Sequence, residues 1–131
     1  MDFNNHMKNY LYPIIIALII FGFSSMPGSA VEAVGFDWSY LAHFGIFGLL
    51  SFTTYRAYYF SLKKRSAFKS VFIIFIFLVL YAASDEWHQS FVPERDVSVL
   101  DFLTDVVGIV VGGLIYVWSN SRFRSRNFID K

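Results

Sequence analysis

Long apolar stretches alternate with short polar ones along the whole chain. The apolar stretches cover residues 10–26, 40–60, 67–87 and 99–118. A helix needs about 20 mostly apolar residues to cross a bilayer, and each stretch comes close to that length. Within the third stretch, Ser70–Leu80 (SVFIIFIFLVL) is apolar on all sides after its first residue, whereas the surface helix of a soluble protein has a polar face. The pattern predicts an all-α polytopic membrane protein, a bundle of four transmembrane helices in which residues 1–131 form a single integral membrane domain.

The first stretch has a second interpretation, a cleaved signal peptide. Basic Lys8 precedes the apolar run, and Gly28-Ser29-Ala30 resembles a cleavage site. The length of the run and the Met26-Pro27 pair that follows it favour a retained anchor. Cleavage would leave three spans without changing the orientation of the others.

Composition supports a membrane protein. Hydrophobic residues make up 56% of the 131 residues and charged residues 16%, and the mean hydropathy is +0.49. Charged residues usually make up about a quarter of a soluble domain. The chain has no cysteine, which excludes disulfides, thiolate zinc sites and cysteine nucleophiles.

The basic residues predict how the chain is oriented. Of the 11 Lys and Arg residues, all but Arg95 lie in the N-terminal arm, around the second connection or in the C-terminal tail: Lys8, Arg56, Lys63, Lys64, Arg65, Lys69, Arg122, Arg124, Arg126 and Lys131. Four spans place these three regions on one side, and Lys and Arg collect on the cytoplasmic side. Both termini are therefore predicted to be cytoplasmic. The basic tail is attributed to topology and to attraction by lipid headgroups, and no nucleic-acid partner is predicted.

This orientation brings polar residues from distant segments together at the outer ends of the helices. They are His43, Glu86, Gln89, Arg95, Asp101 and Asp105. Asp101, Asp105, Gly108 and Gly112 are spaced i, i+4, i+7 and i+11, so they share one helix face. Small residues allow helices to approach closely, and this face is therefore predicted to point into the bundle.

Each of these residues also has a structural interpretation. Asp101 could complete a capping box with Ser98, and Glu86 could form an ion pair with Arg95. His43 alone could be a histidine whose hydrogen bonds are satisfied inside the bundle. Asp85, His88 and Glu94 could form a solvated rim at the outer surface.

The residues between the third and fourth stretches resemble the VanZ-like family. The resemblance rests on the residues Ser84-Asp85-Glu86-Trp87-His88-Gln89, then Pro93-Glu94-Arg95, then Ser98, Asp101, Asp105 and Gly108, with His43-Phe44 upstream. The family pattern reads approximately E-x-x-Q, P-G-R and S-x-x-D-x-x-x-[ND]-x-x-G. This chain departs from it at Glu94, where glycine is usual, and at Ser39 and Tyr40, where many members have Asp-Lys. The resemblance implies a bacterial cell-membrane protein of four helices, with His43, Glu86, Gln89, Arg95, Asp101 and Asp105 as its site.

Two functions from different classes fit such a site. In the first, Arg95 binds the phosphate or carboxylate of a polar headgroup at the outer face. Gln89 and His43 add hydrogen bonds, and Glu86 and Asp101 orient Arg95. The expected partners are a membrane lipid and, because the family takes its name from a member associated with teicoplanin resistance, a cell-wall lipid intermediate or the glycopeptide itself.

The second function is that of an intramembrane enzyme acting on a lipid-linked substrate. Its carboxylates and His43 would supply acid and base groups or bind a hard cation. The sequence has no recognised nucleophile motif and no H-E-x-x-H spacing, and no cofactor or metal is predicted. A third hypothesis is a partner-binding membrane subunit with a purely structural polar cluster. The sequence leaves the ligand and the oligomeric state open.

Overall fold

All the elements that the structure describes are helices. A computed structural model describes residues 3–33, 39–61 and 67–129, with side chains described for residues 8–33, 40–59 and 69–120. The helices are α1 (Phe3–Ser24), α2 (Gly28–Ala33), α3 (Ser39–Ser61), α4 (Ala67–Gln89) and α5 (Val99–Ile129). No strand occurs in these ranges, so the predicted all-α class is confirmed.

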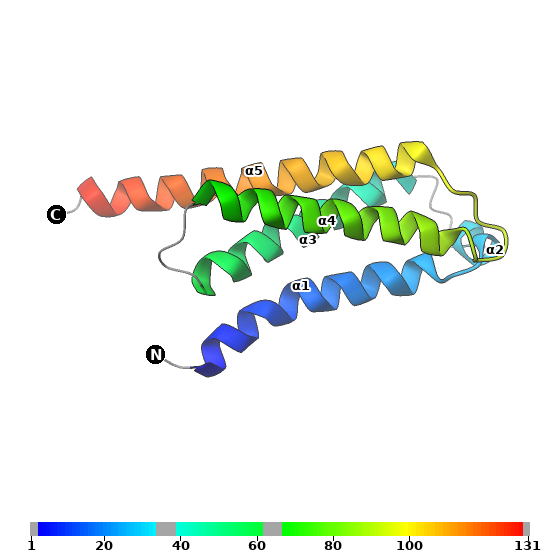
Figure 1. Cartoon of the computed structure of the whole chain (residues 1–131), viewed down its shortest axis with the longest axis horizontal. Helices are drawn as coiled ribbons and strands as arrows, with labels where there is room; N and C mark the ends of the chain where they lie inside the picture. Colours follow the sequence, from blue (N-terminus) through cyan, green and yellow to red (C-terminus); the bar gives the residue numbers. More distant parts are fainter. Residues whose placement is uncertain (1–2, 34–38, 62–66, 130–131) are drawn as a thin grey trace.

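Four long helices run lengthwise, and one short helix lies at their end. Helix α2 and residues 90–98 lie together at one end, whereas α1 begins and α5 ends at the other (Figure 1). Each predicted apolar stretch forms one long helix. Helices α1 and α5 extend beyond the apolar residues at Phe3 and Ile129, because no Gly or Pro interrupts these polar extensions. Helix α2 was not predicted, and it begins directly after Pro27.

Two helices in the described part of the chain are long and apolar enough to cross a membrane. They are Lys69–Gln89 within α4 and Val99–Asn120 within α5. The apolar part of α1, Lys8–Ser24, is shorter, and α3 carries polar residues that include His43 and Arg56. Length and composition therefore support two of the four predicted spans.

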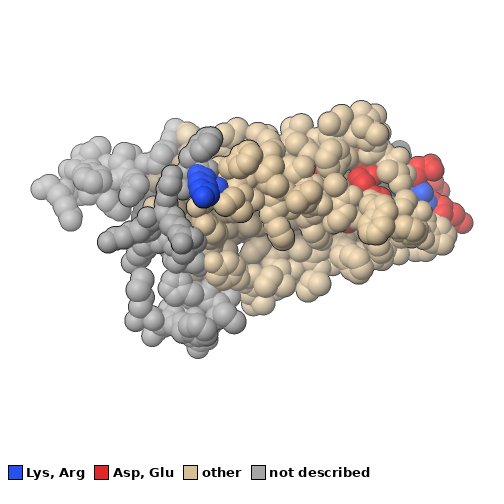
Figure 2. Space-filling model, viewed as in Figure 1, with Lys and Arg blue, Asp and Glu red and all other residues tan. Residues whose placement is uncertain are grey.

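The outside of the bundle is largely apolar. Leu18, Leu49, Phe77 and Leu114, one from each long helix, are all more than half exposed. An uncharged belt covers the middle of the molecule, and acidic side chains gather at the end that holds α2 (Figure 2). Soluble monomers rarely expose apolar surface of this extent, so the surface is of the kind expected for a protein that associates with a membrane.

Helices α3 and α5 touch through their backbones. A Cβ added at Gly112 would overlap the carbonyl oxygen of Gly48, and one added at Gly108 would overlap that of Phe44. A Cβ at Gly48 would lie 3.3 Å from the carbonyl oxygen of Gly108. The prediction that the Asp and Gly face of the last helix points into the bundle is therefore confirmed.

The bundle core forms around this contact and includes α1. Phe47, Leu78 and Ile109 are fully buried, and Ile16 and Ile20 of α1 belong to the same cluster. Burial removes their side chains from polar surroundings and packs them at high density. Helix α1 is thus a packed part of the bundle.

We predict that Gly112→Ala destabilises the protein by about 1–3 kcal/mol, the usual effect of overpacking. The added methyl group meets a backbone carbonyl, which cannot move aside as a flexible side chain can. Thermal unfolding in detergent, followed by circular dichroism, measures the effect. Gly45→Ala is the matched control, because a Cβ there meets nothing within 4 Å. Equal stability of the two variants would contradict the close contact.

Candidate functional site

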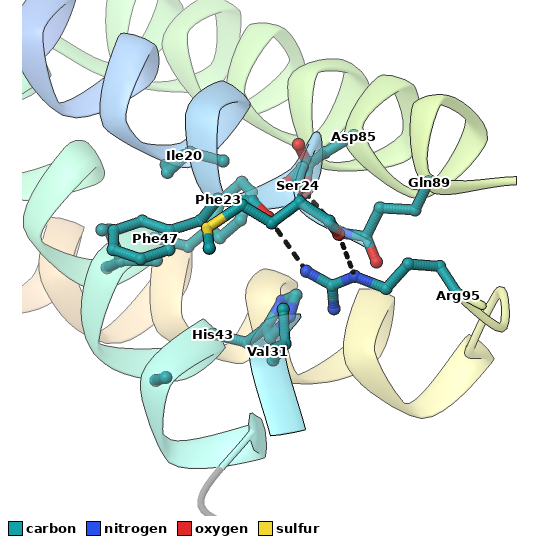
Figure 3. A pocket seen from close by; sticks show the side chains of 12 residues that line it. Ile20, Phe23, Ser24, Val31, His43, Phe47, Asp85, Gln89 and Arg95 are labelled. Atoms are coloured by element: carbon teal, nitrogen blue, oxygen red, sulfur yellow. Dashed lines mark hydrogen bonds between the residues drawn. The ribbon is translucent and has the colours of Figure 1, made fainter. Parts of the chain in front are cut away.

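A cavity of about 350 Å³ opens between α1, α2, α3 and α4. Ligand pockets commonly range from about 300 to 1,000 Å³. Its apolar wall includes Ile20, Phe23 and Phe47, and its polar side chains are those of Ser24, His43, Asp85, Gln89 and Arg95. Ile20 and Phe47 lie toward one end of the cavity, and Asp85, Gln89 and Arg95 lie toward the other (Figure 3). The cavity therefore has an apolar part and a polar end.

Arg95 reaches the polar end from the segment between α4 and α5. Its Nη2 donates to the carbonyl oxygen of Phe23 at 3.0 Å, and its Nε donates to that of Met26 at 3.2 Å. The Phe23 carbonyl belongs to the last turn of α1, where carbonyls lack partners within the helix, and Met26 lies two residues beyond the end of that helix. Arg95 thus caps α1, and the caps fix its guanidinium at the edge of the cavity (Figure 3).

The expected ion pair between Glu86 and Arg95 is not formed. Glu86 Oε2 instead accepts a hydrogen bond from the backbone N–H of Ser98 at 3.1 Å. The carbonyls of α1 orient Arg95, and the prediction that Glu86 and Asp101 do so is wrong. The capping box is also incomplete. The Asp101 N–H donates to Ser98 Oγ at 3.2 Å. In a complete capping box the Asp101 carboxylate would accept a hydrogen bond from the Ser98 N–H, but here Glu86 accepts that bond.

Asp85 is a site residue that the sequence analysis placed on the solvated rim. It is only 4% exposed, and its Oδ2 accepts hydrogen bonds from Ser24 Oγ at 2.8 Å and Gln89 Nε2 at 3.0 Å. The i, i+4 spacing of Asp85 and Gln89 could have revealed that they share a face. Nothing in the sequence identified Ser24 as their partner on α1.

The other two rim residues differ from Asp85. His88 is half-buried, and its ring stacks on Phe21 with centroids 4.7 Å apart. Glu94 is exposed, as predicted.

His43 connects the cavity to a second group of polar residues between α3, α4 and α5. Its Nδ1 lies 2.9 Å from Oδ1 of Asp105, which is fully buried, while the His43 side chain is 15% exposed. One potential ligand atom from each of His43, Glu86 and Asp105 lies within 4.8 Å of the others.

The six predicted residues thus form two adjoining groups. Gln89 and Arg95 line the cavity, Glu86 and Asp105 lie between the helices, and His43 belongs to both. Asp101 begins the buried face of α5 one turn before Asp105.

The backbone at Glu94 helps to place Arg95. Glu94 has a φ of 59°, the left-handed region that favours glycine, and this is the position where the family pattern has glycine. Its Oε2 accepts a hydrogen bond from the Ser29 N–H at 3.1 Å, and the Gly28 N–H donates to the Pro93 carbonyl at 3.2 Å. These bonds dock α2 onto the segment that carries Arg95.

We predict that this docking weakens in acid. Interactions with the Ser29 hydroxyl and then with its backbone N–H lower the pKa of Glu94 below its ordinary value of 4.5. A lowered pKa means that the carboxylate is favoured in the folded state, so the docking is complete above pH 4.5 and is lost as pH falls through the lowered value. The Ser29 amide resonance, followed by NMR, should titrate with a midpoint below 4.5. The step should disappear in Glu94→Gln, and a midpoint at or above the ordinary value would contradict the bond.

Neither the curated proteins nor the solved structures gave a match to this chain. The family model described as VanZ/LLP1 matches residues 7–120, a range that contains all four long apolar segments and every residue of both polar groups. The chain therefore belongs to the VanZ/LLP1 family.

Proposed function

We propose that this protein is a multi-pass protein of a bacterial cell membrane and binds the phosphate or carboxylate headgroup of a lipid at the outer face. Family membership and the exposed apolar surface of all four long helices support placing α1, α3, α4 and α5 across the bilayer. Lys8, Arg56 and Lys69 lie at the end of the bundle opposite α2, and the tendency of Lys and Arg to collect on the cytoplasmic side supports a cytoplasmic location for that end and for both termini. The cavity then opens at the outer side.

The cavity is the observation that carries the proposal. It combines apolar walls with a guanidinium at one end. A lipid has the matching chemistry, because its acyl chain gains from contact with apolar side chains and its headgroup from hydrogen bonds and charge. A small polar metabolite would leave the apolar wall unused.

Arg95 is positioned to receive an anion. Neutral carbonyl groups hold its Nε and Nη2, and Nη1 has no hydrogen-bond partner among the described residues. The nearby carboxylate of Asp85 accepts hydrogen bonds from Ser24 and Gln89. The charge of Arg95 therefore remains available, and the planar guanidinium suits two oxygens of a phosphate or carboxylate.

Several ligands share this chemistry. A cell-wall lipid intermediate joins a long chain to phosphate, and teicoplanin joins an acyl chain to a peptide carboxylate. Binding either one at the outer surface would connect the site to glycopeptide resistance, the association that the family resemblance implies.

One observation favours a second candidate function, an intramembrane enzyme. His43 lines the cavity and is held by Asp105 at 2.9 Å. A carboxylate that orients a histidine is a recurring arrangement for a general base. This function requires that the bound lipid be converted, whereas the binding function predicts its recovery unchanged.

Filling the cavity tests the proposal without removing any hydrogen bond. Ala42 lines the cavity and its side chain is exposed, so Ala42→Trp should fold and occupy the apolar part. Native mass spectrometry of the detergent-purified protein with phosphatidylglycerol should show at least about tenfold weaker binding, the effect of losing roughly 1.4 kcal/mol of contact. Ala83→Trp is the matched control, because Ala83 is exposed on α4 outside the cavity.

The headgroup contact is tested in parallel. Losing a hydrogen bond to a charged group costs about 1.5–3 kcal/mol, so Arg95→Gln should weaken phosphatidylglycerol binding by roughly 10- to 100-fold. Binding of uncharged diacylglycerol should hardly change. Arg56→Gln, at an exposed position on α3, is the control. Unchanged binding in both Ala42→Trp and Arg95→Gln would refute the proposed site, and recovery of a converted lipid would establish the enzyme.

A further inference from the structure

Three buried carboxylate oxygens near His43 have no hydrogen-bond partner. They are Glu86 Oε1, Asp101 Oδ1 and Asp105 Oδ2. Glu86 is 5% exposed and Asp105 is fully buried. A buried polar atom without a partner is unfavourable, and a buried charge is more so. These oxygens therefore indicate a missing positive partner.

The surrounding charge points the same way. Asp101 is close enough to interact electrostatically with His43, Glu86 and Asp105. In the described part of the chain, the sole ion pair at these carboxylates is the one between His43 and Asp105. Three carboxylates thus face one imidazole, and the site lacks positive charge even when that imidazole is protonated.

We propose that His43, Glu86 and Asp105 bind a divalent metal ion, with Asp101 contributing negative charge beside it. The site extends beyond the lipid-binding function and departs from the sequence-based expectation of no metal. Imidazole nitrogen with carboxylate oxygen is a ligand set that suits Zn²⁺ or Mn²⁺.

The distances are compatible with coordination. With metal–ligand bonds of about 2.1 Å, neighbouring ligand atoms at right angles lie roughly 3.0 Å apart and opposite ones roughly 4.2 Å apart. His43 Nδ1 and Asp105 Oδ1 are 2.9 Å apart, and the ligand atoms of all three residues lie within 4.8 Å of one another. A small contraction would bring them onto one ion.

Each ligand comes from a different long helix, so the ion would join α3, α4 and α5 at the end where the cavity opens. Glu86 also holds the start of α5 through the Ser98 N–H. Because His43 lines the cavity, an ion bound to it would fix the orientation of its ring toward the lipid.

The experiment uses the full chain without a histidine tag, in lipid nanodiscs. The protein is treated with a chelator, separated from it, and titrated with Zn²⁺ or Mn²⁺ by calorimetry; bound metal is then counted by mass spectrometry. Wild type should bind one equivalent of one of these ions. Glu86→Gln and Asp105→Asn should each weaken binding by at least roughly 10- to 100-fold. Asp96→Asn, at an exposed acid, should match wild type.

Protons are the competing explanation, since a protonated carboxyl can supply the missing hydrogen bonds. In that case wild type takes up no more metal than the Glu86→Gln and Asp105→Asn variants, and the proposal is overturned. Circular dichroism confirms that each variant is folded. Ala42→Trp should still bind the metal, because it leaves His43, Glu86 and Asp105 unchanged, so a failure of the lipid proposal is distinguishable from a failure of this one.

Discussion

The close approach of α3 and α5 is the constraint on which the rest of the structure depends. Gly48, Gly108 and Gly112 bring the two backbones into contact, and no larger residue fits at Gly108 or Gly112 without displacing a carbonyl. His43 and Asp105 lie one turn or less from this contact, so the same approach places them 2.9 Å apart. An imidazole and a carboxylate are thereby held at fixed positions in a largely apolar bundle.

The remaining helices build outward from this pair. Helix α4 brings Glu86 close to His43 and Asp105, and three residues later it brings Gln89 to the cavity. Helix α1 supplies part of the apolar wall, and the carbonyls of its C-terminal end and of Met26 just after it hold Arg95. The polar end of the cavity is therefore assembled near helix ends, where backbone groups need partners.

The sequence predicted which helix faces are buried better than it predicted which residues contact one another. Apolar stretches located the four long helices, and the spacing of Asp105, Gly108 and Gly112 gave the buried side of α5. Periodicity does not show which residue of another helix lies opposite. The Glu86–Arg95 pair was suggested by opposite charge, but Arg95 donates to carbonyls at the end of α1, and Glu86 accepts a hydrogen bond from the Ser98 amide. Side-chain patterns do not reveal such backbone partners, and the three residues between α1 and α2 gave no sign of the docking at Glu94.

The central claim is that a lipid occupies the cavity with its headgroup at Arg95. Photocrosslinking in nanodiscs tests it most directly. The probe is a phosphatidic acid that carries a diazirine in its acyl chain, and mass spectrometry identifies the labelled peptides. The account predicts that labels concentrate on cavity residues such as Ile20, Ile46 and Phe47 and decline when unlabelled anionic lipid competes. Labels spread evenly over the outer faces of α4 and α5, without competition, would show that the lipid only surrounds the protein and would contradict the account.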